Sequence, residues 1–174
     1  MKKILFISIL IISFSSLSFS QKEKIKWYSI SELDNLLKAN PKPVFIDAFT
    51  DWCIWCKRLD QNTFSNPVIA DILSNKYYAV KFNAEGKDPI TFHGQKFIND
   101  GKSGNAHQLA VALLKGQLSY PTVVFMDDKG QLLAPVAGYR EAKEMEQILS
   151  YFSDKSYEKQ TFQEFQKSFK GKVK

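Results

Sequence analysis

Hydrophobic and polar positions alternate along the chain in two periods, one typical of helices and the other typical of strands. Apolar residues three and four positions apart predict helices over 30–40, 54–62, 66–73 and 140–152. Compact apolar runs predict strands over 43–49, 77–83, 121–126 and 132–137. A turn at Asp128-Lys129-Gly130 joins the last two strands into a predicted hairpin. Helices and strands that alternate in this order predict an α/β domain.

Capping residues mark the beginnings of two of these helices. Ser29 and Glu32 have the spacing of a capping box, in which each residue bonds the backbone of the other. Asn66 followed by Pro67 has the pattern of an N-cap and a first-turn proline. Both helices are therefore predicted from local side-chain chemistry as well as from apolar spacing.

The stretch 84–119 is the least regular part of the chain. A small hairpin is predicted over 90–98, and a helix over 105–115 with Asn105 as its N-cap. A segment of this length between core strands is usually functional or a decoration. We interpret 84–119 as an insertion, and two hypotheses stay open: the insertion shapes a substrate groove, or it is ornamental.

Aromatic residues near the C-terminus predict one more element. Tyr157, Phe162, Phe165 and Phe169 have amphipathic spacing, which predicts a last helix over about 156–169 that covers the globule. The 174 residues, of which 44% are hydrophobic and 24% charged, fit a single folded domain. A chain of this length needs no disulfide framework to be stable, so its two cysteines require a chemical explanation.

The first twenty residues have the pattern of a secretory signal. Lys2 and Lys3 precede an apolar run over 4–12, and Ser18-Phe19-Ser20 places small residues where a signal peptidase reads. The alternative, a membrane anchor, requires an apolar run of about 20 residues, which this segment lacks. We therefore expect cleavage after residue 20 and a single mature domain over 21–174.

The charge of the chain excludes one class of partner. The formal net charge is +6, and its basic residues form neither a dense run nor a stretch interleaved with aromatic residues. Nucleic-acid-binding proteins usually carry such a footprint. Nucleic acid is therefore not an expected partner, least of all for an exported protein.

The reactive side chains are concentrated in Asp51-Trp52-Cys53-Ile54-Trp55-Cys56-Lys57, where a predicted strand meets a predicted helix. Two cysteines separated by two residues can close a small disulfide ring. At the start of a helix, backbone N–H groups and the positive end of the helix dipole favour the thiolate of the first cysteine. Cys53 is therefore the predicted nucleophile, at an exposed position, and Cys56 the resolving thiol, one turn deeper.

Two other interpretations of the cysteine pair stay open. A purely structural bridge across so short a loop would contribute only about 2 kcal/mol by the chain-entropy estimate. A metal site would need further ligands, and the two histidines, His93 and His107, both lie in the irregular stretch, where each is expected to be a surface or capping residue. The alternative function is a redox-inert binding module or metallochaperone that uses the cysteines as metal ligands.

The order of elements and motifs resembles a known family. A helix, a strand, Trp52-Cys53-Ile54-Trp55-Cys56-Lys57, a helix, a strand, Tyr120-Pro121-Thr122, a hairpin and a helix look like a thioredoxin-like domain, over about 30–152. The dithiol motif followed by Thr63-Phe64-Ser65-Asn66-Pro67 is similar to the C-terminal periplasmic domain of the transmembrane thiol reductase DsbD and to secreted stand-alone relatives. The resemblance implies a thioredoxin-like fold, with a central mixed β-sheet flanked by helices, an insertion before the proline-led strand and an extra C-terminal helix.

The resemblance also implies roles for residues outside the cysteine motif. Asp47, six residues before Cys53, matches the buried acid that accepts a proton from the resolving thiol, and Lys81 matches the lysine paired with that acid. Burial of this carboxyl group is expected to raise its pKa unless it is compensated, although a merely structural ion pair is the alternative. Pro121 matches the family's cis-proline, which exposes the backbone of Tyr120 to substrate.

Two tryptophans of the motif are candidates for substrate binding. Trp52 directly precedes the first cysteine. Trp55 is either an exposed aromatic platform for a partner or a residue that packs against the insertion, and we favour the platform. Ile54 and Trp55 replace the Gly-Pro of thioredoxin itself, a difference that is expected to change the reduction potential.

Together these patterns predict a secreted or periplasmic thiol-disulfide oxidoreductase of the protein-disulfide reductase or isomerase type. Its expected partners are proteins that carry thiols or disulfides, together with a membrane thiol reductant that supplies electrons. Exchange through a mixed disulfide requires no bound cofactor. Reduction is the predicted direction, because the resemblance is to a reductase and Ile54 and Trp55 bring no positive charge to the sulfurs.

Overall fold

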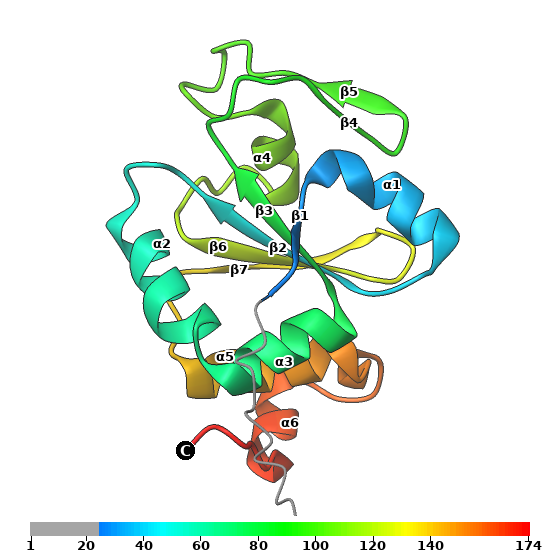
Figure 1. Cartoon of the computed structure of the whole chain (residues 1–174), viewed down its shortest axis with the longest axis vertical. Coiled ribbons are helices and arrows are strands. Elements are labelled where there is room, and N and C mark those ends of the chain that lie inside the picture. The colour runs from blue at the N-terminus through cyan, green and yellow to red at the C-terminus, as the bar shows by residue number, and fades with distance from the viewer. Residues whose placement is uncertain (1–24) are drawn as a thin grey trace, which may run out of the picture.

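The computed structural model describes residues 25–174, in which a five-stranded sheet forms the centre (Figure 1). The strands are β1 (Trp27–Tyr28), β2 (Val44–Phe49), β3 (Tyr78–Asn83), β6 (Thr122–Met126) and β7 (Leu132–Ala137), in the order β1-β3-β2-β6-β7. Strands β1, β2 and β3 are parallel, whereas β6 runs antiparallel to β2 and β7 antiparallel to β6. The predicted mixed sheet is confirmed, and only the short β1 lacks a counterpart among the predicted elements.

Helices cover both faces of this sheet. The helices α1 (Ile30–Ala39) and α4 (Gln108–Leu113) lie on one face, and α3 (Pro67–Lys76) and α5 (Ala142–Ser153) lie on the other (Figure 1). Alternate residues of β2 belong to the two cores: Ile46 and Ala48 pack in the cluster that contains α1 and α4, and Phe45 packs in the cluster that contains α3 and α5. Strand β2 is therefore buried on both faces, as its apolar sequence predicts.

The capping residues begin the helices as predicted. The backbone N–H and the hydroxyl group of Ser29 donate to the carboxylate of Glu32 at 2.7 and 2.8 Å. The side-chain oxygen of Asn66 accepts from the backbone N–H of Val68 at 2.9 Å. Each cap satisfies a backbone group that the first turn of a helix leaves without a partner.

The helix that follows the cysteine motif changes its pitch. Helix α2 (Ile54–Arg58) continues directly into the π-helical segment η1 (Leu59–Phe64), so the helical stretch ends two residues later than predicted. The hydroxyl group of Thr63 donates to the carbonyl oxygen of Arg140 at 2.6 Å. This bond fastens the end of η1 to the chain just before α5.

The insertion contains the predicted hairpin, formed by β4 (Ile90–Phe92) and β5 (Gln95–Phe97). The predicted helix over 105–115 is shorter than expected, because α4 begins at Gln108 with His107 as its N-cap. The buried imidazole Nδ1 of His107 accepts from the backbone N–H of Leu109 at 3.1 Å. A neutral imidazole nitrogen can therefore replace the side-chain oxygen that usually caps a helix, while Asn105 stays in the loop.

Apolar residues of the insertion form part of the main core. Phe92, Leu109, Ala110, Leu113 and Leu114 are buried in the same cluster as Ile46 and Val80 of the central strands. Burial of this kind stabilises the fold in proportion to the apolar area removed from water. This part of 84–119 is therefore an integral layer of the domain and not a surface ornament.

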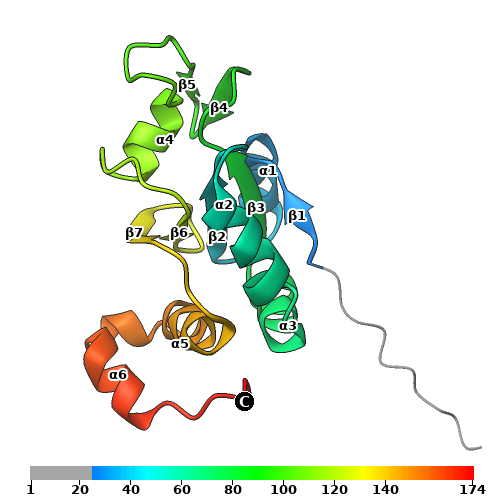
Figure 2. The same cartoon turned by 90° about the vertical axis from the view of Figure 1, so that its left-hand side faces the viewer.

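The C-terminal helix is divided where the sequence analysis predicts one helix over about 156–169. A 3₁₀ turn, η2 (Ser156–Glu158), is followed by α6 (Phe162–Ser168), which begins at Thr161 with a capping box to Glu164. The competing cap explains the break, because a side-chain bond at Thr161 starts a new helix. Phe162 and Phe165 pack against Tyr151 of α5 with ring centroids 5.3 and 5.4 Å apart, and α6 lies outside α5 in Figure 2.

The predicted signal sequence, residues 1–20, lies outside the described residues, so its cleavage stays a prediction. Within 25–174, none of the helices has both the length and the apolar character that a membrane crossing requires.

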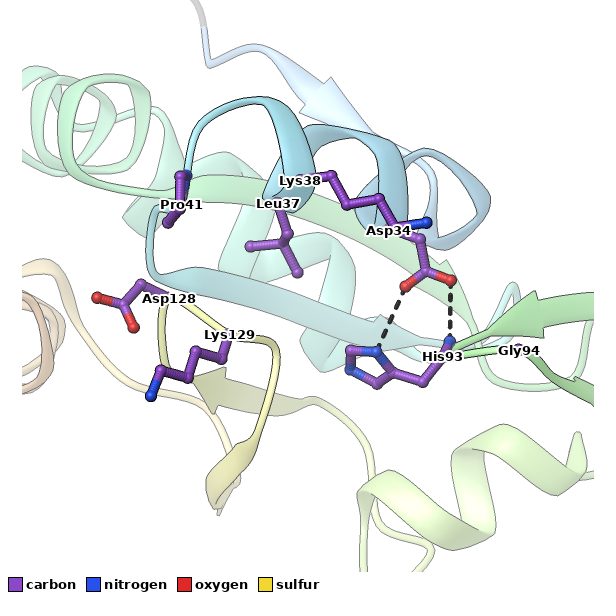
Figure 3. A pocket seen from close by; sticks show the side chains of 8 residues that line it. All are labelled: Asp34, Leu37, Lys38, Pro41, His93, Gly94, Asp128 and Lys129. Atoms are coloured by element: carbon purple, nitrogen blue, oxygen red, sulfur yellow. Dashed lines mark hydrogen bonds and ion pairs between the residues drawn. The ribbon is translucent and has the colours of Figure 1, made fainter.

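His93 connects the insertion hairpin to two other parts of the fold (Figure 3). Its backbone N–H donates to Asp34 of α1 at 2.9 Å, and its ring Nδ1 lies 3.5 Å from the other oxygen of that carboxylate. Its ring Nε2 lies 3.0 Å from the carbonyl oxygen of Gly130, in the turn between β6 and β7. These contacts form one wall of a cavity of about 580 Å³ that Leu37, Lys38, Pro41, Gly94, Asp128 and Lys129 also line.

Gly130 is expected to tolerate alanine poorly because of this contact. Its φ is +75°, and an added Cβ would lie 2.7 Å from Nε2 of His93. Gly101 has φ +74° and open space around it, so Gly101→Ala isolates the backbone penalty of about 1–2 kcal/mol. We expect Gly130→Ala to lower the free energy of unfolding by that amount plus about 1 kcal/mol for the displaced ring. If urea titrations gave equal losses of unfolding free energy for the two variants, the expected clash with His93 would be contradicted.

Candidate active site

The two cysteines lie where β2 ends and α2 begins. Cys53 is the N-cap of α2, and its Sγ accepts a hydrogen bond from the backbone N–H of Cys56 at 3.0 Å. The backbone N–H of Cys53 donates to the carbonyl oxygen of Thr50 at 3.1 Å, which closes the turn before the helix. The two cysteines form a disulfide, and their Cα atoms are 5.3 Å apart.

The position of Cys53, rather than its exposure, distinguishes the two sulfurs. Both cysteines are only 3% exposed, so the expected exposure of Cys53 is absent from the disulfide form. Packing of the turn that carries the motif therefore leaves both cysteines buried. Only the sulfur of Cys53 accepts a helix N-terminal N–H group, and such a bond stabilises a thiolate.

Asp47 and Lys81 meet across two neighbouring strands. They are direct register partners of β2 and β3, and Nζ of Lys81 lies 2.6 Å from Oδ2 of Asp47. The carboxyl group is fully buried, and its Oδ1 has no hydrogen-bond partner among the described residues. Burial raises the pKa of Asp47 from 3.8 to about 6, although the charge of Lys81 opposes this shift. The structure thus places a carboxyl group that can titrate near neutral pH in the strand that leads to Cys53.

Asp60 completes this charged group and is absent from the sequence prediction. Its carboxylate comes from η1 and forms a second ion pair with the ammonium group of Lys81. The Asp60 side chain is 47% exposed, whereas that of Asp47 is fully buried, so Lys81 bridges a buried carboxylate and a solvated one. The sequence contained one signal that could have identified Asp60: it lies four residues after Cys56, which is one helical turn further along the same side of a helix.

Trp52 is exposed but held in place from two sides. Its indole Nε1–H donates to the carboxylate of Glu85 at 3.0 Å. Its ring lies edge-on to that of Tyr120, with centroids 6.1 Å apart. The Tyr120–Pro121 peptide bond is cis, the isomer that the family resemblance implies. The structure therefore brings together Trp52, Tyr120 and Pro121, three predicted substrate-binding residues.

Trp55 packs against residues outside the insertion. Its ring lies 5.4 Å from that of Tyr139, between β7 and α5, and the guanidinium group of Arg58 lies 4.5 Å above it. Half of the side chain remains exposed. The neighbours Tyr139 and Arg58 both lie outside the insertion, and the role of Trp55 as an aromatic platform for a partner stays a prediction.

Exposed large apolar side chains are concentrated around the cysteines. Among residues 25–174 they are Trp52, Ile54, Trp55, Ile98 and Leu118. The first three belong to the motif itself, and Leu118 lies two residues before Tyr120. A local concentration of this kind is typical of a surface that contacts other proteins.

The two histidines make structural contacts within other parts of the fold. His107 caps α4, and His93 connects the hairpin to Asp34 and Gly130. Within the described part of the chain, no three side chains of the types His, Cys, Asp and Glu are grouped so that they could hold a metal ion.

Comparison with known proteins places this chemistry in a family. A family model described as a thioredoxin-like domain matches residues 32–153. The thiol:disulfide interchange protein DsbD of Pectobacterium atrosepticum is 29% identical over 128 residues, which cover 72% of this chain and 19% of DsbD. DsbD of Escherichia coli K12 is 31% identical over 120 residues, which cover 66% of this chain and 18% of that protein. The chain thus spans about a fifth of the length of these relatives.

Solved structures agree on the fold. The oxidoreductase DsbH is 18% identical with a TM-score of 0.54, over 75% of this chain and 85% of that one. A thioredoxin-fold protein from Helicobacter pylori is 19% identical with a TM-score of 0.56, over 74% of this chain and 80% of that one. Both likenesses show a shared thioredoxin-like fold.

The buried Asp47 carboxyl is expected to lower the stability of the protein as the pH rises. Because its pKa is about 6 in the folded chain and 3.8 for a free side chain in water, the folded state binds the extra proton between these values. The contribution of Asp47 to stability is therefore greatest below about pH 4 and is lost progressively as the pH rises past about 6, by about 3 kcal/mol in total.

Asp47→Asn removes this titration, because an amide stays neutral. We expect the variant to gain stability relative to the natural protein as the pH rises from about 4 to about 6, and to keep a constant advantage above that. Urea unfolding of both proteins across this range measures the difference. A difference that is independent of pH would contradict the titration.

Proposed function

Because the chain belongs to the thioredoxin-like domain family and is a thiol-disulfide oxidoreductase, we propose that it reduces disulfides of other proteins outside the cytoplasm. The observation that carries the proposal is the Cys53–Cys56 disulfide at the N-terminus of α2. A dithiol in this position cycles between a reduced and an oxidised form. The exposed tryptophans beside it support a protein substrate.

The reaction begins at Cys53. Its thiolate attacks one sulfur of a substrate disulfide, a mixed disulfide forms, and the second substrate sulfur leaves as a thiolate that takes a proton. Cys56 then loses its proton and attacks the Sγ of Cys53, which releases the first substrate sulfur as a thiol. Two electrons pass from the dithiol to the substrate, and the Cys53–Cys56 disulfide forms.

Asp47 is the proposed acceptor of the proton that Cys56 loses. Its raised pKa, about 6, is close to the value at which a carboxylate accepts and returns protons near neutral pH. Its Oδ1 has no hydrogen-bond partner among the described residues and is free to accept. Lys81 holds the other oxygen at 2.6 Å and orients the carboxyl group.

The proposed direction, reduction, requires an electron donor. A membrane thiol reductant would convert the Cys53–Cys56 disulfide back to the dithiol by the same exchange chemistry. Similarity to DsbD supports such a partner, and the predicted signal sequence at 1–20 supports a periplasmic or secreted location. Ile54 and Trp55 add no cation that would stabilise the thiolate and make the pair oxidising.

Replacement of each cysteine is expected to block a different step of the exchange reaction. Cys53→Ser should abolish exchange, because the attacking sulfur is lost. Cys56→Ser should retain attack but lose resolution, so mixed disulfides with substrate proteins should accumulate and be visible on non-reducing gels. If neither variant formed mixed disulfides with substrate proteins, the assignment of Cys53 as the nucleophile and Cys56 as the resolving thiol would be wrong. If the purified protein contained stoichiometric metal and did not reduce insulin, the metal-binding alternative would be favoured.

The direction of electron flow is expected to show in the reduction potential. Equilibration of the Cys53–Cys56 couple with glutathione buffers should give a reduction potential that is closer to that of thioredoxin, about −270 mV, than to that of DsbA, about −120 mV. A potential close to that of DsbA, or faster oxidation of reduced proteins than reduction of oxidised ones, would make the protein an oxidase.

A further inference from the structure

The first turn of the insertion 84–119 and the residue directly after the insertion both contact Trp52. Glu85, near its beginning, accepts the hydrogen bond from the indole of Trp52. Tyr120, directly after its end, packs against the same indole. An exposed tryptophan beside a reactive disulfide thus depends on the insertion for its position.

A single side chain in the middle of the insertion holds the turn that carries Glu85. The amide nitrogen of Asn99 lies 3.2 Å from the carbonyl oxygen of Glu85, 3.1 Å from that of Gly86 and 2.7 Å from that of Asn105. Asn99 therefore joins the first turn of the insertion to the loop that leads into α4.

The neighbours of Asn99 are themselves fixed. The backbone N–H of Ile98 donates to the side-chain oxygen of Gln108 at 3.1 Å. The backbone N–H of Gln108 donates in turn to the carbonyl oxygen of Ile98 at 3.0 Å. On the other side, the backbone N–H of Glu85 donates to Asn83 at 3.0 Å, and the amide of Asn83 donates to Asp51 at 3.1 Å. A continuous set of hydrogen bonds therefore runs from α4 to the residue before Trp52.

From this network we propose that the insertion is a substrate-recognition element and that Asn99 is the positioning residue that sets Trp52 through Glu85. The proposal rests on the proposed function. The substrate it selects is a polypeptide with apolar side chains next to its disulfide, since Trp52 is an exposed apolar side chain directly before Cys53 and Ile54, directly after Cys53, is exposed as well. Small disulfides, which do not reach this surface, are not selected by it.

The test compares a protein disulfide, insulin, with a small disulfide, oxidised glutathione, as substrates of the full chain. Asn99→Ala and Glu85→Ala should each raise KM for insulin roughly three- to tenfold, the range expected for a lost hydrogen bond. The effect on kcat should be small, and the rate with glutathione disulfide should not follow the rise in KM. Glu85→Gln, which retains a side-chain oxygen for the indole N–H, should restore KM.

Two controls separate positioning from damage to the fold. Lys102→Ala alters an exposed lysine of the same insertion and should match the natural protein. In a Trp52→Ala background, Asn99→Ala should add no further rise in KM, because the residue it positions is gone. If Asn99→Ala fails to fold by circular dichroism, the Glu85→Ala and Glu85→Gln pair decides the question.

Three results would overturn the proposal. They are an unchanged KM for insulin in both alanine variants, equal losses with insulin and glutathione disulfide, and additive effects of Asn99→Ala and Trp52→Ala. Failure of the natural protein to exchange with either disulfide would instead refute the proposed function, so the two failures are distinguishable.

Discussion

The burial of strand β2 on both faces is the constraint on which the rest of the structure depends. A strand removed from water must bond its backbone groups on both edges, and β3 and β6 provide these bonds. The resulting register pairs Asp47 with Lys81 on one side and Ala48 with Thr122, the residue after Pro121, on the other. One packing requirement thus delivers the acid, its lysine and the cis-proline to the end of the strand where Cys53 begins a helix.

The buried Asp47 carboxylate has a desolvation cost that its ion pair with Lys81 offsets only in part. Removal of a carboxylate from water is unfavourable, and the raised pKa of Asp47 shows that the charge of Lys81 does not fully compensate it. A buried titratable group with a shifted pKa is a common property of functional sites. Asp60 shares Lys81 from the solvent side, so the balance of charge at Asp47 depends on the π-helical segment that follows the cysteine helix.

The insertion has two functions in the architecture. Its apolar residues extend the core on the α1 face, and its polar residues reach the active-site loop through Asn99 and Glu85. The two are physically connected, since a hydrogen-bonded loop keeps its position only when the elements on either side are packed. These contacts make 84–119 a structural part of the domain, and its role in shaping a substrate groove stays a prediction.

The sequence by itself determined the features that depend on neighbours two to four residues apart. These are the alternation of helices and strands, the caps at Ser29 and Asn66, and the dithiol at a helix start. Tertiary structure alone decided the contacts between distant segments, such as Trp52 with Glu85, 33 residues apart, and Lys81 with Asp60, 21 residues apart. It also decided that His107 caps α4 and that Cys53 is buried, because both depend on which side chains packing brings together and not on local periodicity.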